Sequence, residues 1–160
     1  MLAMSRIPAV ARALTGPGSE SRNTLPHAFR IAGASFVAVM ALGHLSALFA
    51  LPAGLGDVAI GLRAPFTASR LTRGTGRRDA IRLHALGTAD LVTALILGGL
   101  TGYNIVHSAP PSDALPLLPI VLIPTTGVPL LLALHIVSLR HLAATKRTPQ
   151  VATQPATALG

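Results

Sequence analysis

The sequence predicts an all-α fold, a four-helix transmembrane bundle with both termini in the cytoplasm. Three observations lead to this fold. First, 51% of the 160 residues are hydrophobic and only 11% are charged, against about 25% in an average soluble domain. Second, four segments are apolar and long enough to cross a bilayer. Third, the basic residues lie almost entirely in alternate connections, as the positive-inside rule requires.

The composition narrows the function classes. Thirteen Lys and Arg residues against five Asp and Glu give a net charge of +8, which in a soluble protein would suggest nucleic acid. A mean hydropathy of +0.61 and 3% aromatic residues argue against a nucleic-acid partner. No cysteine is present, and we find no nucleophile motif, no phosphate loop and no metal-ligand pair at helical spacing. We therefore expect no enzymatic activity, no cofactor and no metal site.

Each predicted span has about 20 residues, which at 1.5 Å per residue cross the ~30 Å hydrocarbon core. The four spans are residues 31–50, 51–69, 83–102 and 115–139. The second is the weakest, since it contains several glycines, Asp57, Arg63 and Pro65. The spans define a transmembrane domain at 28–142, flanked by a disordered basic cytoplasmic tail at 1–27 and a disordered cytoplasmic tail at 143–160.

The basic residues decide the topology. Twelve of the thirteen precede the first span, separate the second from the third, or follow the fourth, and only Arg63 lies within a span. A re-entrant second segment would place the arginine-rich loop at 70–82 on the wrong side of the membrane. We predict a multi-pass protein of the plasma membrane. The loop arginines set this topology, or they also bind anionic lipid headgroups; the candidates are Arg70, Arg73, Arg77 and Arg78.

Three ionisable residues, Asp57, Arg63 and Asp90, lie at membrane depth. Each costs about 2.5–3.5 kcal/mol on insertion scales. Counting from the span ends places Asp90 level with Arg63, and Asp57 level with His44. We expect an Asp90–Arg63 ion pair and a second polar layer of Asp57 and His44. These layers either hold the helices together or carry protons or ions.

The fourth span contains an irregular segment. Pro124, Gly127 and Pro129 interrupt the regular helix, and Thr125 and Thr126 are available to cap the freed carbonyls. Either one helix is broken at a binding site, or a short segment precedes a helix that begins near Pro124. We expect this break and Asp57 to line one cavity, because both need water or a ligand.

Histidines offer a further alternative. His84 and His135 both lie toward the cytoplasmic side, so a bis-His haem between the third and fourth spans is conceivable. The low aromatic content argues against a porphyrin pocket.

Two motifs connect the chain to other sequences. LPAGLGD at 51–57 follows the pattern LPAGxGD, and residues 123–139 follow IPTxxVPxxxxLHxxSL. Together with FRIAG at 29–33 and the LG and DL dipeptides at 86–91, they resemble a family of small, uncharacterised multi-pass bacterial membrane proteins over residues 27–142. Members often have Asn and Phe at the positions of His84 and Thr126. The resemblance implies the fold and no activity.

The sequence therefore favours a small transport or ion- or proton-coupled membrane component. The alternative is a structural or accessory subunit of a larger membrane complex, and the more distant one is a haem-binding membrane protein. The bilayer is the expected partner, and a homo-oligomer or a larger complex stays open. The candidate site residues are His44, Asp57, Arg63, Asp90, Thr125, Thr126 and His135.

Overall fold

The computed structural model describes residues 14, 16, 18–112, 114–118 and 120–145, and within them every regular element is a helix. The elements are α2 (Ser19–Thr24), the 3₁₀-helix η2 (Leu25–Gly33), α3 (Ala34–Ala41), α4 (Ala47–Thr72), α5 (Arg77–Gly102), the π-helix η3 (Ile123–Gly127) and α6 (Val128–Thr145). Four stretches are long and apolar enough to cross a membrane: Ser19–Ala41, Ala47–Thr72, Arg77–Gly102 and Ile123–Ala144. The predicted all-α bundle with four such helices is confirmed.

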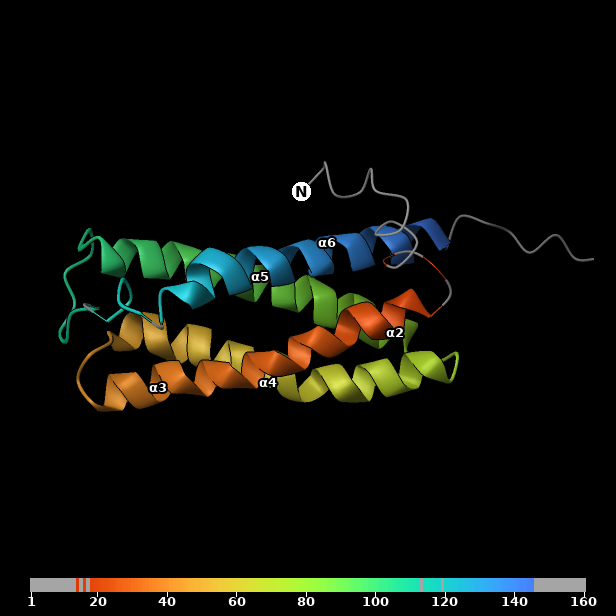
Figure 1. Ribbon diagram of the computed structural model, residues 1–160, viewed down its shortest axis with the longest axis horizontal. Helices are drawn as coiled ribbons and strands as arrows, with labels where there is room; N and C mark the ends of the chain where they lie inside the picture. The colour runs from red at the N-terminus through yellow and green to blue at the C-terminus, as the bar shows by residue number, and fades with distance from the viewer. Residues whose placement is uncertain (1–13, 15, 17, 113, 119, 146–160) are drawn as a thin grey trace, which may run out of the picture.

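Successive spans run in opposite directions (Figure 1). The start of α2, the turn between α4 and α5 and the end of α6 lie at one end of the bundle, which we call the basic end because it carries Arg70, Arg73, Arg77 and Arg78. The turn between α3 and α4 and the long connection from α5 to η3 lie at the opposite end. Which end faces the cytoplasm stays a prediction.

The first span differs from the prediction. It covers Ser19–Ala41 rather than 31–50, so residues 19–27, predicted as tail, are helical. Pro26 is accommodated in the first turn of η2, where a missing N–H does no harm. Close packing fixes this segment, since a Cβ added to Gly61 of α4 would lie 2.6 Å from the backbone nitrogen of Ile31. The predicted tail residues 1–13 and 146–160 lie outside the described residues, and α6 continues to Thr145.

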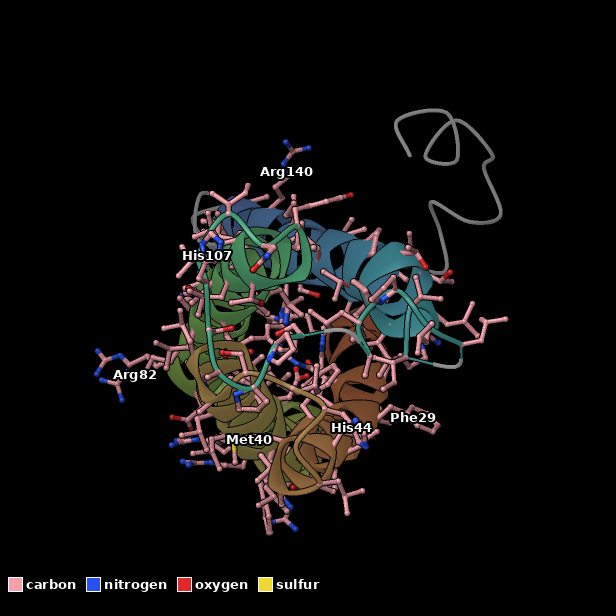
Figure 2. The ribbon with its side chains drawn as sticks, turned by 90° about the vertical axis from the view of Figure 1, so that its left-hand side faces the viewer. Phe29, Met40, His44, Arg82, His107 and Arg140 are labelled. Carbon is pink, nitrogen blue, oxygen red and sulfur yellow. The ribbon has the colours of Figure 1, made fainter. Side chains whose placement is uncertain are left out.

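Polar and apolar residues are distributed as a lipid environment requires. Large apolar side chains cover the outside, including Phe29 and Tyr103, each 84% exposed, while Arg30 is only 3% exposed. Figure 2 shows Phe29, Arg82 and Arg140 pointing away from the bundle. In water such a surface would associate or aggregate, whereas in lipid it is well solvated. The chain is compatible with a multi-pass membrane protein.

An apolar cluster closes the bundle at the opposite end. Phe36 and Phe49 meet edge to face with ring centroids 5.2 Å apart. The cluster, which we call the apolar plug, consists of Phe36, Leu45, Phe49, Ala50, Ala53 and Leu115. The amide of Ser46 donates to Ser112 Oγ at 3.3 Å, which attaches the start of α4 to the long connection. The polar side chains of the bundle interior lie outside this plug.

The fourth span begins at Ile123 with the π-helical turn η3, and the residues described between 114 and 121 form turns rather than helix. This agrees with the second of the two predicted forms, a short segment followed by a helix that begins near Pro124. The hydroxyl of Thr125 donates to the carbonyl oxygen of Val121 at 2.6 Å, a carbonyl that also accepts the Thr125 backbone N–H at 3.2 Å; capping of a carbonyl freed by proline stays a prediction. Thr126 is exposed.

Candidate functional site

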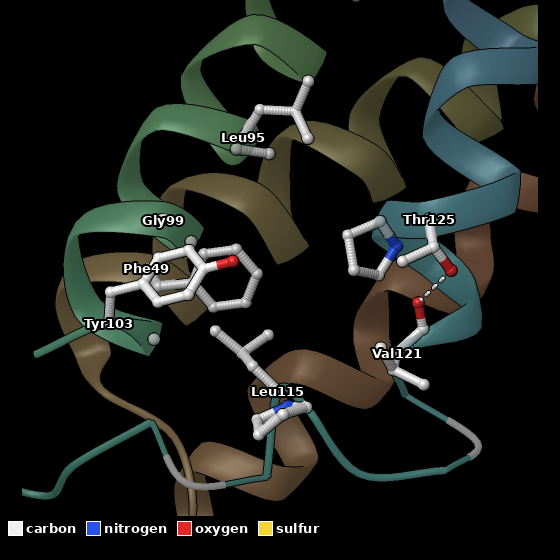
Figure 3. Close-up of a pocket in the computed structure, with 12 residues that line it drawn as sticks. Phe49, Leu95, Gly99, Tyr103, Leu115, Val121 and Thr125 are labelled. Carbon is white, nitrogen blue, oxygen red and sulfur yellow. Dashed lines mark hydrogen bonds between the residues drawn. The ribbon is translucent and has the colours of Figure 1, made fainter.

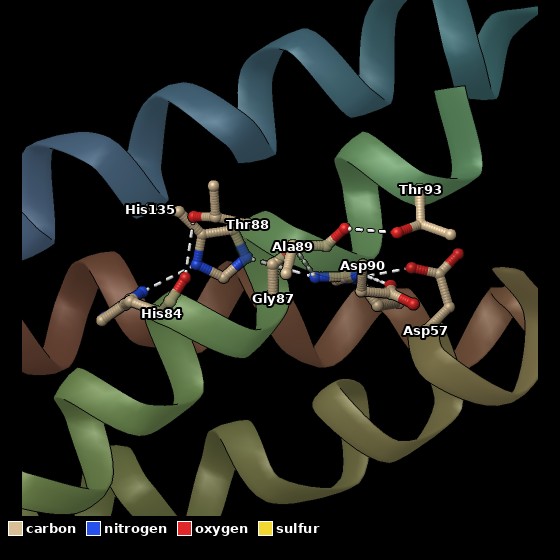
Figure 4. Close-up of polar contacts among 9 residues, drawn as sticks. Asp57, His84, Gly87, Thr88, Ala89, Asp90, Thr93 and His135 are labelled. Atoms are coloured by element: carbon tan, nitrogen blue, oxygen red, sulfur yellow. Dashed lines mark hydrogen bonds and ion pairs between the residues drawn. The ribbon is translucent and has the colours of Figure 1, made fainter. Parts of the chain in front are cut away.

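A buried arginine connects three spans near the middle of the bundle. Arg30 of η2 donates from Nε to Asp57 Oδ1 of α4 at 2.6 Å, and its Nη2 pairs with Asp90 Oδ2 of α5. Figure 4 shows the two carboxylates converging from their helices. A guanidinium has five N–H donors in one plane, so it can serve both acids at once. With both carboxylates ionised, this ion cluster carries one excess negative charge.

The predicted ion pair of Asp90 with Arg63 is wrong. Asp90 pairs with Arg30, and Arg63 is exposed on α4. The error follows from the boundary of the first span. Arg30 is expected outside the membrane because a charge inside the membrane is costly, but in the structure two carboxylates offset that cost. With the observed ends, Arg30 precedes the end of its span by eleven residues and Asp57 follows the start of α4 by ten, so the two are level.

The predicted layer of Asp57 and His44 is also wrong. His44 is exposed in the turn between α3 and α4. Asp57 lies ten residues into α4, about 15 Å from that turn at 1.5 Å per residue. Of the seven candidate residues, the structure brings together Asp57, Asp90 and His135. Sequence reasoning missed Arg30 and His27, and considered His84 only for haem.

Three glycines make room for these polar side chains. A Cβ added to any of them would collide with a side chain of the site: Gly33 with Asp57, Gly56 with Asp90, and Gly87 with His135. Gly56 immediately precedes the aspartate of the LPAGLGD motif. The motif therefore combines a carboxylate with the space that a second carboxylate from α5 needs.

A line of hydrogen bonds continues from the ion cluster toward the basic end. Arg30 can only donate, so Nη1 donates to His135 Nε2 at 3.1 Å. His135 then carries its proton on Nδ1 and donates to His84 Nδ1 at 2.8 Å. His84 in turn donates from Nε2 to Thr24 Oγ1 at 3.3 Å, and the Thr24 hydroxyl donates to the carbonyl oxygen of Glu20 at 2.7 Å. This pattern holds both imidazoles neutral and assigns their tautomers.

His27 lies against this line without joining it. Its ring stacks on His135 with centroids 3.7 Å apart, and its edge approaches His84 at 5.4 Å. The side chain is fully buried, yet neither ring nitrogen has a hydrogen-bond partner among the described residues. One nitrogen from each of the three rings lies within 4.8 Å of the others. We call His27, His84 and His135 the histidine triad. No spacing rule finds it, because its members come from three different spans.

The haem alternative does not fit this geometry. Two axial histidines must face each other across an iron atom, with a porphyrin ring between them. His84 and His135 instead contact each other directly, Nδ1 to Nδ1 at 2.8 Å, and both side chains are under 2% exposed. A macrocycle has no room between them.

Two voids lie on the other side of the ion cluster. A cavity of about 20 Å³ is lined by Asp57, Pro124 and Val128, among others, so Asp57 and the start of the break border one small void; the water-filled cavity expected there stays a prediction. A pocket of about 330 Å³ opens at the opposite end, where Thr125 and Tyr103 line it (Figure 3). The two voids share wall residues: Phe49, Ala94, Leu95 and Pro124.

A third void lies at the basic end. This pocket of about 390 Å³ is lined by Glu20, Ser21, Thr72 and His141, among others. Glu20 and His141 approach to 3.3 Å between a carboxylate oxygen and Nδ1. Because the backbone of Glu20 accepts the last hydrogen bond of the line, the polar residues extend from this pocket to the middle of the bundle.

The comparisons with known proteins give a family and no activity. A family model described as a domain of unknown function (DUF8737) matches residues 1–143. The chain belongs to this family. The matched range includes the ion cluster and the histidine triad, as well as the arginine-rich loop. No curated protein and no solved structure matches the chain. The function must therefore be argued from the site.

Proposed function

We propose that this protein is a small cation-transport component of the membrane. The observation that carries the proposal is the buried cluster of Arg30, Asp57 and Asp90, which has one carboxylate more than its arginine requires. An ion pair that only joins helices needs one acid for each base, and every further intramembrane charge adds to the cost of insertion. A surplus carboxylate beside a cavity is the arrangement expected of a cation-binding step.

Polar groups and voids together outline a route through the bundle. On the basic side, the pocket at Glu20 leads through Thr24 and the two hydrogen-bonded histidines to the ion cluster. On the other side, the small cavity at Asp57 adjoins the larger pocket, with Phe49 in the wall of both. Phe49 of the apolar plug lies in the wall of both voids and is therefore the residue best placed to act as a gate.

An accessory subunit would be favoured by small residues that are free to contact a partner, because small residues mark helix contacts in membranes. Two glycines of α4 and α5 instead lie against the chain's own helices. A Cβ on Gly54 would lie 2.8 Å from Val37, and one on Gly98 would lie 3.2 Å from Phe49. These glycines pack the bundle itself, which favours the transport proposal over the accessory one.

The test is cation flux into liposomes that contain the purified full-length chain. Entrapped indicators for protons and for divalent metal ions would report entry driven by a membrane potential. We expect flux above that of empty liposomes, and strong reduction by Asp57→Asn or Asp90→Asn. Asp79→Asn is the matched control, because Asp79 pairs with Arg70 at 2.7 Å on the surface of the basic end. Flux equal to that of empty liposomes, or flux unchanged by both core substitutions, refutes the proposal.

The gate has its own pair of variants. Phe49→Ala removes a ring that is 4% exposed and that separates the two voids, so flux should rise. Phe66→Ala removes a ring that is 71% exposed on the same helix and should leave flux unchanged. Equal effects of the two substitutions would exclude Phe49 as the gate.

A further inference from the structure

We propose that the histidine triad binds a divalent transition-metal ion of the Zn²⁺ class. This names the cation of the proposed function and rests on that function only for the transport of the ion, since binding can be measured without transport. The site consists of His27 from η2, His84 from α5 and His135 from α6, which place one ring nitrogen each within 4.8 Å of the others.

The first support is the state of His27. A buried polar group is almost always hydrogen-bonded, because an unpaired one has lost its water without replacement. His27 is 0% exposed, and among the described residues both of its ring nitrogens lack such a partner. The two neighbouring imidazoles cannot supply one, since the hydrogen-bond line already uses all four of their nitrogens. A metal ion held between the three rings would satisfy His27.

The second support is the chemistry of the donor set. Metal ions bind neutral imidazole, and the line of hydrogen bonds holds His84 and His135 in that form. Their Nδ1 atoms face each other at 2.8 Å, whereas two nitrogens at 2.0–2.1 Å from a tetrahedral zinc lie roughly 3.4 Å apart. The two rings must therefore separate by roughly half an ångström. Imidazole alone suits Zn²⁺, Cu²⁺ or Ni²⁺ rather than Ca²⁺ or Mg²⁺, which prefer oxygen.

The third support is the neighbouring charge. A divalent cation in a low-dielectric interior needs an anionic partner, and with both carboxylates ionised the ion cluster beside the triad has one negative charge in excess. The two sites share a contact, from Arg30 Nη1 to His135 Nε2 at 3.1 Å. A metal on His135 Nδ1 moves the ring proton to Nε2, which can then no longer accept from Arg30. Arg30 keeps its contacts with the carbonyl oxygen of Gly87 at 3.3 Å and with both carboxylates. Because metal binding removes the contact between Arg30 and His135, it is coupled to the ion cluster.

The pocket at the basic end is the proposed point of entry for the ion. The pocket there presents the carboxylate of Glu20 and the imidazole of His141, two groups that bind the same class of metal ion. From Glu20, the contact through Thr24 reaches His84, the first member of the triad. Three histidines also leave one of four coordination positions open, as a site that must release its ion requires.

The test uses Co²⁺, whose visible absorption reports tetrahedral coordination. The purified full-length chain without a polyhistidine tag is titrated with Co²⁺ in detergent, and Zn²⁺ is then added as competitor. We expect intense d–d bands that Zn²⁺ abolishes. His27→Phe keeps a ring to stack on His135 but removes both nitrogens, and should weaken binding by at least about 100-fold, since loss of an outer-shell partner alone costs 10–100-fold. His44→Phe, in the exposed turn, is the matched control.

A second variant guards against misfolding. His84→Gln keeps an amide that can bond Thr24, and size-exclusion chromatography reports whether each variant stays monodisperse. Absence of the bands in the native chain, bands unchanged in a monodisperse His27→Phe or His84→Gln, or bands lost in His44→Phe would each overturn the proposal. Metal binding without flux leaves the site standing and refutes transport. Proton flux without metal binding leaves transport standing and refutes the metal site.

Discussion

Replacing Arg30 by methionine removes the cation that two buried carboxylates share. The side chains of Asp57 and Asp90 are only 13% and 17% exposed, so neither gains enough water to compensate. Removal of one partner of a buried ion pair costs about 3–5 kcal/mol, because the remaining charge is left unpaired. Methionine keeps the length and apolar stem of the side chain, so the loss reports the charge rather than a cavity.

The loss should be visible as a lower unfolding temperature. For a chain of this size, 1 kcal/mol corresponds to about 2–4 °C, which predicts a decrease on the order of 10 °C. The assay heats the detergent-purified protein and measures by size exclusion the fraction that stays monodisperse. Arg63→Met is the matched control, since Arg63 is exposed on α4, and it should change little.

Rescue gives the sharper result. Adding Asp57→Asn and Asp90→Asn to Arg30→Met removes both unpaired charges while keeping their shape, and should restore more than half of the lost stability. If Arg30→Met is no more harmful than Arg63→Met, or if the two asparagines add further loss, then Arg30 does not bind the two carboxylates in the folded protein.

Three further predictions concern other parts of the chain. Gly87→Ala should lower the unfolding temperature, because its Cβ would collide with His135, whereas Gly99→Ala, with no atom within 4 Å of its Cβ, should gain helix stability of up to about 1 kcal/mol; equal effects in the thermal assay would contradict the packing described. A reporter fused at Thr75 should lie in the cytoplasm, and one fused at Ser112 should lie on the other side of the membrane. Activity of a cytoplasmic reporter at Ser112 would refute the predicted topology. Replacing Arg73 and Arg78 with glutamine, while keeping the Arg70–Asp79 pair, should reduce the anionic lipid retained on purification as measured by mass spectrometry; unchanged lipid would assign these arginines to topology alone.

The sequence was sufficient for the fold class because its signals are local. An apolar segment of about 20 residues must form a helix in lipid, where every backbone group needs an internal partner. That argument predicts four helices without knowing their neighbours. It also identified Asp57 and Asp90 as residues that need partners, because the cost of a charge at membrane depth does not depend on the fold.

Only the tertiary structure decided who those partners are. The predicted first span begins after Arg30, since a lone charge inside the membrane is costly. That wrong boundary placed His44 and Arg63 in the wrong layers. The cost for Arg30 is offset when two acids from α4 and α5 meet its guanidinium, in contacts between residues 27 and 60 positions apart in the sequence. The histidine triad likewise draws on three spans. Spacing along one helix predicts contacts within that helix, whereas the charge and metal chemistry of this bundle arise between helices, where packing alone sets the distances.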